Sequence, residues 1–529
     1  MNPARMVIPV VASGVLLALA WLGVSGFILL VALVPLLFVE DFFRESKFRY
    51  NSFVFWLFSL ITFLVWNTLA VWWIWYATPI GAMFAILMNS FLMALVWWVA
   101  HIAGRMKGKT FGRMVLVVAW VSFEYLHYHW DVSWPWLTLG NGLANDVKFI
   151  QWYEYTGVFG GSLWILIMNV LFAELIRMTG TSLRRKDVGI LLVGLFLLFF
   201  PVISSLAIYY SYHEKSDPVR VVIAQPNIDP YNDKFSGMSV ADQLHRLLQV
   251  SDSLGDSSVD FFVGPETALH EIWENNADDD TQIVAIKQFL KDRYPEAAFV
   301  VGASTFYRYF PGDSIPLSAR SENGGQLIYD AFNSACFIEK DSSILFYHKT
   351  KLVSGVEKMP FKRQLRFLEK WIIHLGGISG TLGTPTDTVI FEKGVTRVAV
   401  PICYESGYGE YLSGFIQKGA NVFFIITNDG WWRNSPGYRQ HLSYSRLRAI
   451  EFRRDIARAG NTGISCFIDQ RGDLLQKSKW WVKTSLSGAM NRNNRITFYA
   501  RHGDYLARFS LLLFVLMLLI LPGKKMFFR

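Results

Sequence analysis

The segment RVAVPICYESG (residues 397–407) runs from a short apolar stretch directly into a polar turn that begins at Cys403. Such a stretch, bounded by turn residues, is typical of a buried strand. The same pattern precedes Glu266 in FFVGPETALH (261–270) and Lys349 in ILFYHKTKLV (344–353). Side chains at strand ends are held by a rigid scaffold and can still meet a substrate. Three strand ends therefore offer a thiol, a carboxylate and an ammonium group.

Around these segments the sequence alternates between short apolar runs and helical patterns. This alternation predicts an α/β layered domain. No GxGxxG follows a strand and no GxxxxGK[ST] is present, so nucleotide binding has no support. Strands are expected at 219–224, 261–263, 298–301, 335–338, 395–401, 422–426 and 463–468, and helices at 282–293 and 440–454.

The rest of the chain is strongly apolar. Apolar residues make up 52% of the sequence, and the mean hydropathy is +0.27. A membrane span needs about 20 mostly apolar residues. Candidate spans lie at 6–22, 24–40, 52–74, 80–101, 114–128, 156–176, 188–210 and 508–522. We expect a membrane domain of seven transmembrane helices at 1–215, a soluble domain at 216–504, and an eighth helix with a cytoplasmic tail at 505–529.

Basic residues lie on one side of the expected spans. The loops after spans two, four and six hold eleven Lys and Arg residues, whereas the loops between them hold only Lys148. The positive-inside rule places both termini in the cytoplasm and the soluble domain outside. A cleavable signal peptide ending at 18–20 is the alternative. The second apolar run follows almost at once, which favours a helical hairpin. The basic residues are Arg44, Lys47, Arg49, Arg105, Lys107, Lys109, Arg113, Arg177, Arg184, Arg185 and Lys186, with Arg5, Lys524, Lys525 and Arg529 at the ends.

The net charge of +9 does not indicate a nucleic-acid partner, because much of the basic excess lies in these loops. The three cysteines are far apart and form no CxxC pair, so we expect no metal site. Cys336 and Cys466 are expected to be buried structural residues, with a mutual disulfide as the alternative.

Taken one at a time, Glu266, Lys349 and Cys403 each have an ordinary structural explanation. Together they form a plausible nucleophilic site. A cysteine needs a base to become a thiolate, and a carboxylate can accept that proton. An ammonium group can stabilise the negative oxygen of a tetrahedral intermediate. No GxSxG motif supplies a competing serine nucleophile.

The ordered set Glu266, Lys349 and Cys403 resembles the carbon–nitrogen hydrolase (nitrilase) superfamily. With the expected spans on either side, the whole chain is similar to the bacterial apolipoprotein N-acyltransferases, a membrane-embedded branch. The matching motifs are AQPNI (224–228), GPET (264–267), YHKTKLV (347–353), CYES (403–406), TNDGWW (427–432), QHL (440–442), RAIE (448–451), NTGIS (461–465) and SWPW (133–136).

The resemblance implies a multi-span α-helical membrane domain plus an α-β-β-α layered sandwich. It implies that Cys403 takes an acyl chain from a phospholipid such as phosphatidylethanolamine, forming a thioester, with Glu266 as base and Lys349 as oxyanion donor. The α-amine of a diacylglyceryl apolipoprotein would then receive the chain in a ping-pong reaction. No cofactor or metal is implied, and a monomer in the bacterial inner membrane is expected.

Further residues take expected roles from the same resemblance. Glu357, Tyr404 and Glu405 are expected to support the catalytic residues, and Phe235, Trp431, Trp432 and Trp136 to bind substrate. Val-Ser-Gly-Val before Glu357 and Asp455 after Arg454 depart from the family pattern, which bears on loop conformation and lipid preference.

Two other functions are alternatives: the first uses the same three residues as catalysts, and in the second the soluble domain only recognises a ligand. A membrane-tethered amidase or nitrilase would replace the amine by water and would need no large membrane domain. A transporter or lipid receptor would place charged residues along a path through the membrane, and Glu124 is the acid we would nominate.

Overall fold

The computed structural model describes residues 3–178, 185–322, 326–361, 381–385 and 388–521. Arg184, Lys524, Lys525 and Arg529, used in the orientation argument, lie outside these ranges. The chain divides into two compact units. One comprises residues 1–75, 79–212 and 502–529, and the other comprises residues 76–78 and 213–501. The expected boundaries stood at 215/216 and 504/505.

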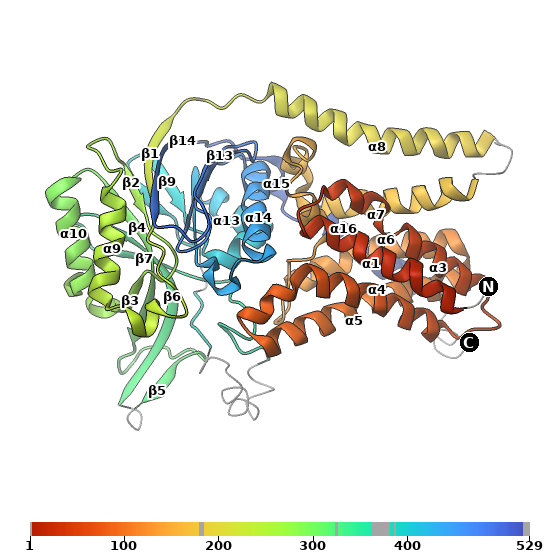
Figure 1. The fold of residues 1–529 in the computed structure, drawn as a ribbon, viewed down its shortest axis with the longest axis horizontal. Coiled ribbons are helices and arrows are strands. Elements are labelled where there is room, and N and C mark those ends of the chain that lie inside the picture. Colours follow the sequence, from red (N-terminus) through yellow and green to blue (C-terminus); the bar gives the residue numbers. More distant parts are fainter. Residues whose placement is uncertain (1–2, 179–184, 323–325, 362–380, 386–387, 522–529) are drawn as a thin grey trace. The chain divides into compact units, whose positions relative to one another are not determined.

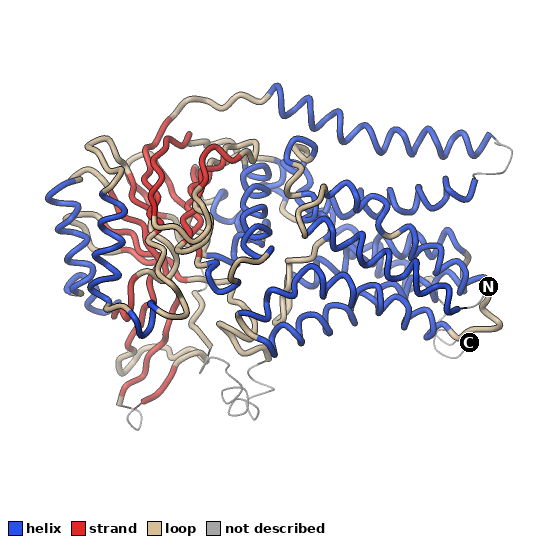
Figure 2. Tube along the Cα trace, viewed as in Figure 1, coloured by secondary structure: helices blue, strands red, loops and turns tan. Residues whose placement is uncertain are grey.

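The first unit is helical, as Figure 2 shows in blue. Each expected span falls on one or more helical segments, but the helix at the span expected at 114–128, Lys109–Tyr128, is not among the described segments that are long and apolar enough to cross a membrane. Five helical segments are long and apolar enough to cross a membrane: Gly26–Glu45, Ser52–Tyr76, Pro79–Lys107, Tyr153–Met178 and Asp187–Ser211. The first and last expected spans form shorter apolar helices. The helices are α1 (Val7–Trp21), α2 (Leu29–Ala32), α3 (Val34–Glu45), α4 (Ser52–Val71), α5 (Pro79–Lys107), α6 (Lys109–Tyr128), α7 (Tyr153–Met178), α8 (Arg185–Ser211) and α16 (Tyr505–Leu519).

Small residues let helices of this unit approach closely. A Cβ on Gly112 of α6 would lie 2.7 Å from the Cα of Gly104 of α5. Backbones pack this closely only where side chains are absent, which is a common device between membrane helices. Arg113, counted above as a loop residue, is buried and donates to Asp41 Oδ2 at 2.8 Å.

The second unit contains two β-sheets. The first has the order β14-β1-β2-β4-β6-β5, with β3 on β4 and β7 on β6, and the second has the order β13-β12-β11-β10-β9-β8. The strands are β1 (Pro218–Gln225), β2 (Phe261–Val263), β3 (Leu269–Trp273), β4 (Ala298–Arg308), β5 (Arg320–Glu322), β6 (Leu327–Ile338), β7 (Leu345–His348), β8 (Phe391–Lys393), β9 (Thr396–Ala399), β10 (Val422–Thr427), β11 (Ile456–Gly460), β12 (Cys466–Ile468), β13 (Leu474–Lys477) and β14 (Thr484–Asn491).

Helices cover the outer faces of both sheets (Figure 1). Helices α9 (Val240–Asp252) and α10 (Thr281–Arg293) pack on the first sheet, and α13 (Gly409–Gln417) and α14 (Pro436–Phe452) on the second. In β1, Val222 joins the core under α9, while Val221 and Ile223 join the core between the sheets. This alternation follows from the two-residue period of a strand. The predicted α-β-β-α sandwich is confirmed.

Several expected elements have different bounds: β4 and β6 extend well beyond the strands expected at 298–301 and 335–338. The helix expected at 440–454 begins at Pro436, because the Ser435 hydroxyl accepts from Gly437 N, and ends before Arg453, whose φ is +51°. A left-handed residue at that place ends a helix. The strand expected at 463–468 starts only at Cys466. Asn461 lies ahead of this strand, and its side-chain oxygen accepts from the Ile228 N–H at 3.0 Å.

The cysteines lie in separate surroundings. Cys336 packs in the core under α9 and α10, and Cys466 packs in the core of the second sheet, on the face of β12 opposite to Phe467. Both are buried free thiols. The structural interpretation therefore holds, and the disulfide alternative does not.

The packing between the sheets yields a stability prediction. Phe424 of β10 meets Phe261 of β2 with ring centroids 5.3 Å apart, and both are buried. Phe424→Ala should destabilise the unit by about 3–5 kcal/mol, because it removes apolar contacts and leaves a cavity. Thermal unfolding in detergent checks this, with Leu317→Ala as control, since Leu317 is 89% exposed. Equal midpoints for the two variants would contradict the prediction.

Candidate active site

The three predicted catalytic residues stand where strands of both sheets end. Glu266 follows β2, and Lys349 follows β7. Cys403 follows Ile402, which pairs with Ile426 of β10, and begins a 3-10 turn, Cys403–Gly407. The two sheets thus contribute to one site, the first with a carboxylate and an ammonium group and the second with a thiol.

Glu266 and Lys349 form a buried ion pair. Lys349 Nζ donates to Glu266 Oε1 at 3.1 Å, and the two residues are 1% and 7% exposed. The backbone N–H of Asn428 donates to the other carboxylate oxygen at 3.0 Å. Burial raises the pKa of Glu266, but the Lys349 ammonium and hydrogen bonds outweigh it and hold that pKa below its ordinary value. Glu266 is therefore an anion able to accept a proton.

Glu357 completes the surroundings of the ammonium group. Lys349 Nζ donates to Glu357 Oε1 at 2.7 Å, and Val353 N donates to its Oε2 at 2.8 Å. The amide of Asn333, on β6, donates to both carboxylates, at 2.8 Å to Glu266 and 3.1 Å to Glu357. Burial lowers the pKa of Lys349, but the two carboxylates raise it well above its ordinary value. The lysine remains charged.

Cys403 interacts electrostatically with both members of this pair. Burial raises the pKa of its thiol, the charge of Glu266 raises it further, and Lys349 opposes them; the result is well above the ordinary value. The resting group is a thiol, so its reaction requires a base. Its φ of +49° is left-handed, a conformation that non-glycine residues adopt only where the structure enforces it.

Glu405 fixes the turn that carries the nucleophile. Its Oε2 accepts from Ile402 N at 2.9 Å and from the Tyr347 hydroxyl at 2.7 Å. Its Oε1 accepts from Thr350 N at 2.7 Å and Lys351 N at 3.1 Å. One buried carboxylate thus ties the Cys403 turn to the segment holding Lys349. Burial raises the pKa of Glu405, and these hydrogen bonds limit the rise. These contacts are the ones expected if Glu405 holds Cys403 and Lys349 in place.

A second buried network lies beneath the nucleophile. The His441 ring has Nε2 3.0 Å from the Cys403 carbonyl oxygen and Nδ1 2.8 Å from Asp429 Oδ1. Arg458 donates to Asp429 Oδ2 at 2.7 Å. Burial raises the pKa of Asp429, but Arg458 and His441 lower it far below the ordinary value. Tyr404 is buried with its ring edge-on to Tyr408, at 5.3 Å.

Comparison with known proteins supports what the geometry indicates. The sequence model described as "Carbon-nitrogen hydrolase" matches residues 221–498, more than half of the chain. The chain belongs to the carbon–nitrogen hydrolase family. A second model, described as "Apolipoprotein N-acyltransferase N-terminal domain", matches residues 13–171.

Curated relatives of this carbon–nitrogen hydrolase extend over nearly the whole chain. A protein named apolipoprotein N-acyltransferase from Chlorobaculum tepidum is 29% identical and covers 90% of this chain and 88% of its own. One of the same name from Geobacter metallireducens is 28% identical, covering 96% and 93%. A solved structure of Saccharomyces cerevisiae Nit3, of the nitrilase superfamily, matches with a TM-score of 0.37 and 11% identity, covering 59% and 97%. The resemblance to the N-acyltransferases is thus confirmed.

Three of the predicted substrate-binding residues lie in one unit of this carbon–nitrogen hydrolase. Phe235 is 73% exposed and stacks on Trp431, with ring centroids 6.3 Å apart. Trp432 lies edge-on to His441 at 5.5 Å. Trp136 belongs to the helical unit, where it is 3% exposed and packs on Trp73 at 5.1 Å. Trp136 is thus part of the packing of the helical unit, and its contact with substrate stays a prediction.

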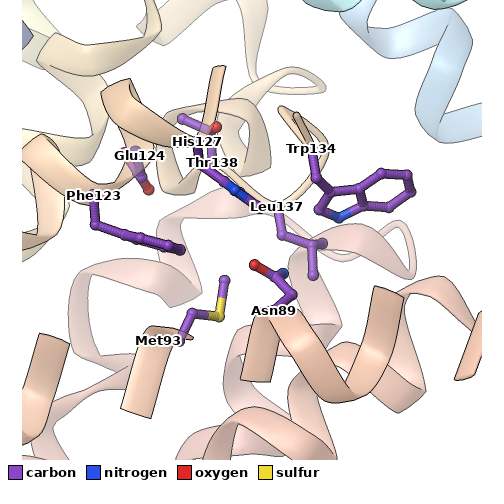
Figure 3. A pocket seen from close by; sticks show the side chains of 8 residues that line it. All are labelled: Asn89, Met93, Phe123, Glu124, His127, Trp134, Leu137 and Thr138. Atoms are coloured by element: carbon purple, nitrogen blue, oxygen red, sulfur yellow. The ribbon is translucent and has the colours of Figure 1, made fainter. Parts of the chain in front are cut away.

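Glu124, the acid nominated for a membrane path, is buried and hydrogen-bonded within the helical unit. It lies within α6, where its Oε1 accepts from Trp120 Nε1 at 2.9 Å and from Leu139 N at 2.8 Å, which holds the following loop. Beside it is a cavity of about 10 Å³, whose lining residues Figure 3 shows. That volume is about enough for one water molecule. The receptor alternative therefore gains no support from Glu124.

The sequence did not reveal all the residues that build the site. Asn333, which bridges the two carboxylates, and the buried lysine Lys234 were not singled out. A polar pair inside the apolar strand AFNSACFI (331–338) was the available signal for Asn333. Asp429 and His441 belong to the motifs TNDGWW (427–432) and QHL (440–442), but only the fold shows that they lie beneath Cys403. Among the described residues, no group of three or more His, Cys, Asp or Glu side chains could hold a metal ion.

A glycine behind Glu266 yields a testable requirement. A Cβ on Gly302 of β4 would lie 2.5 Å from both Glu266 Cα and Thr267 N. Gly302→Ala should displace Glu266 and slow alkylation of Cys403 by iodoacetamide about 10- to 100-fold, because small misplacements of a catalytic group are costly. The rate of Cys403 alkylation is followed by mass spectrometry at a temperature below the midpoint of thermal unfolding of each variant. Gly414→Ala is the control, since its nearest neighbour would be 3.9 Å away. Equal rates would refute the requirement.

Proposed function

We propose that this protein transfers an acyl chain from a phospholipid to the N-terminal amine of a diacylglyceryl lipoprotein. One observation carries the proposal: a carbon–nitrogen hydrolase domain with Glu266, Lys349 and Cys403 at its strand ends is joined to apolar helices in a chain matching N-acyltransferases over nearly its full length. Lipid substrates leave a bilayer at a cost of about 0.8 kcal/mol per CH₂, so membrane helices suit such an enzyme.

In the first half-reaction, Glu266 takes the proton of the Cys403 thiol. The thiolate attacks the ester carbonyl carbon, and the negative oxygen is stabilised by the Lys349 ammonium. The carbon–oxygen bond then breaks, the lysophospholipid alcohol takes the proton from Glu266, and Cys403 carries a thioester.

In the second half-reaction, the lipoprotein amine attacks the thioester carbonyl and loses a proton to Glu266. The carbon–sulfur bond breaks, an amide forms, and the Cys403 thiolate regains a proton. The two half-reactions make a ping-pong sequence. Phosphatidylethanolamine as donor, Phe235, Trp431 and Trp432 as lipid contacts, and a monomeric enzyme are parts of this proposal.

Thioester formation tests the reaction. Full-length protein in detergent is incubated with phosphatidylethanolamine carrying a labelled acyl chain. Hydroxylamine-sensitive label should appear on the parent and on Cys336→Ala, and should be absent from Cys403→Ala. The Cys336 thiol is fully buried, so its removal controls for the loss of a cysteine. A diacylglyceryl-cysteine peptide with a free amine should then remove the label as an amide.

Other outcomes separate the alternatives. Release of the label as free fatty acid, with no transfer to the peptide, would favour a hydrolytic enzyme. Absence of label from every variant, with lipids of several headgroups, would refute the phospholipid donor. Full transfer by Cys403→Ala would refute the nucleophile.

The orientation in the bacterial inner membrane is also part of the proposal, because basic residues gather in alternate loops. Cysteines introduced as Leu317→Cys and Lys107→Cys test it, since both positions are exposed. A membrane-impermeant maleimide added to spheroplasts should label the first and not the second. The parent chain gives the background. The reverse pattern would place the carbon–nitrogen hydrolase domain in the cytoplasm.

A further inference from the structure

The charges around the catalytic lysine do not balance among the residues discussed so far. Glu266 and Glu357 are both hydrogen-bonded to the single ammonium group of Lys349. Two carboxylates and one ammonium group leave one negative charge in a largely buried site. Such a charge is costly unless another group compensates it. A further positive charge is therefore expected nearby.

Lys234 supplies a cation at this place. It lies in the turn Asp233–Gly237, and its side chain is 8% exposed. Its Nζ donates a short hydrogen bond to the hydroxyl of Thr267, the residue that follows Glu266. Its backbone carbonyl accepts from the Gln243 amide of α9 at 2.9 Å. The lysine is thus held against the segment that carries the catalytic carboxylate.

The interaction of Lys234 with Glu266 is mutual. Burial lowers the pKa of Lys234 to about 8, while Glu266 opposes that decrease. Lys234 in turn helps to keep the pKa of Glu266 below its ordinary value. Burial, and to a smaller extent the charge of Lys234, lower the pKa of nearby His270 to about 4, so His270 is neutral at pH 7 and adds no charge.

The other groups facing Glu266 come from several elements. Lys349 after β7 is a cation, Asn333 of β6 and the backbone N–H of Asn428 after β10 are neutral donors, and the Cys403 thiol titrates. Glu357 reaches Glu266 through Lys349 and Asn333. Against this set, Lys234 is the second cation.

We propose that Lys234 is a positioning residue of the acyl-transfer reaction, which acts through Glu266 by keeping this carboxylate ionised and ready to accept the Cys403 proton. The inference rests on the proposed function, because it concerns the base of that reaction. When the proton moves from Cys403 to Glu266, the negative charge moves to sulfur. With both cations in place, the cluster stays neutral throughout.

The location of Lys234 also links the base to the predicted substrate-binding aromatics. Phe235 is the next residue, and its ring stacks on Trp431. The Lys234 ammonium lies 5.9 Å from the centroid of the Phe235 ring. Phe235 and Lys234 are consecutive residues, so a change in the position of one also moves the other. The predicted contact with the acyl donor and the charge state of Glu266 therefore depend on the same short segment.

The pH dependence of thioester formation tests the inference. Removing a nearby cation should raise the pKa of Glu266, because the ionised carboxylate then loses a favourable electrostatic interaction. The acid limb of the pH–rate profile is the range in which Cys403 acylation slows as the pH falls through the pKa of Glu266. In Lys234→Met this limb should lie about one pH unit higher, so that acylation at a pH on the limb is about tenfold slower than in the parent. Lys234→Gln repeats the test with a polar side chain should the first variant not fold. Lys234→Arg keeps the charge and should restore the parent limb.

Two controls separate charge from structure. Thr267→Ala removes the hydroxyl that holds the Lys234 ammonium but keeps both charges, so its acid limb should move in the same direction as that of Lys234→Met, but by less. Lys291→Met makes the same substitution on the exposed surface of α10 and should match the parent.

A normal acid limb in both neutral Lys234 variants would refute the inference while leaving the proposed function intact. No acylation of the parent at any pH would instead refute the proposed function.

Discussion

The buried ammonium group of Lys349, held between two carboxylates, is the interaction on which the site depends. Ions removed from water need partners on every side. Here the partners come from the end of β2, from β6, from the N–H after β10 and from the turn at Val353–Glu357. Because these segments belong to both sheets, the ion cluster and the sandwich stabilise each other. A thiol placed beside the cluster is held near its base without being ionised at rest.

Cys403 is held in place by a second set of contacts. Cys403 sits in a left-handed conformation, which is unfavourable for a residue with a Cβ. Glu405 holds one side of its turn through four hydrogen bonds, and His441 lies against the Cys403 carbonyl. These groups touch the turn, and their buried charges are themselves paired or hydrogen-bonded. Strain at the nucleophile is thus offset by a surrounding polar network.

The amino-acid sequence predicted the layered sandwich and a helix at each expected span, because strands and spans have distinct periods and lengths. Its least accurate parts were the ends of elements. Arg453 ends α14 by its left-handed conformation, and the strand expected at 463–468 starts only at Cys466. Asn461 precedes this strand and binds Ile228, 233 residues away, which no local pattern reveals.

By itself, the sequence determined which side chains are the candidates for the chemistry, because Glu266, Lys349 and Cys403 follow apolar strands in recognisable motifs. Only the tertiary structure decided what surrounds them. Asn333, Asp429 and Lys234 enter the site from other elements. The Asn333 side chain bonds residues 24 and 67 positions away, Asp429 bonds His441 and Arg458 at 12 and 29, and the Lys234 ammonium bonds Thr267 at 33. The physical reason is electrostatic. Whether a buried charge is compensated depends on distances of a few ångströms in space, which spacing along the chain does not specify.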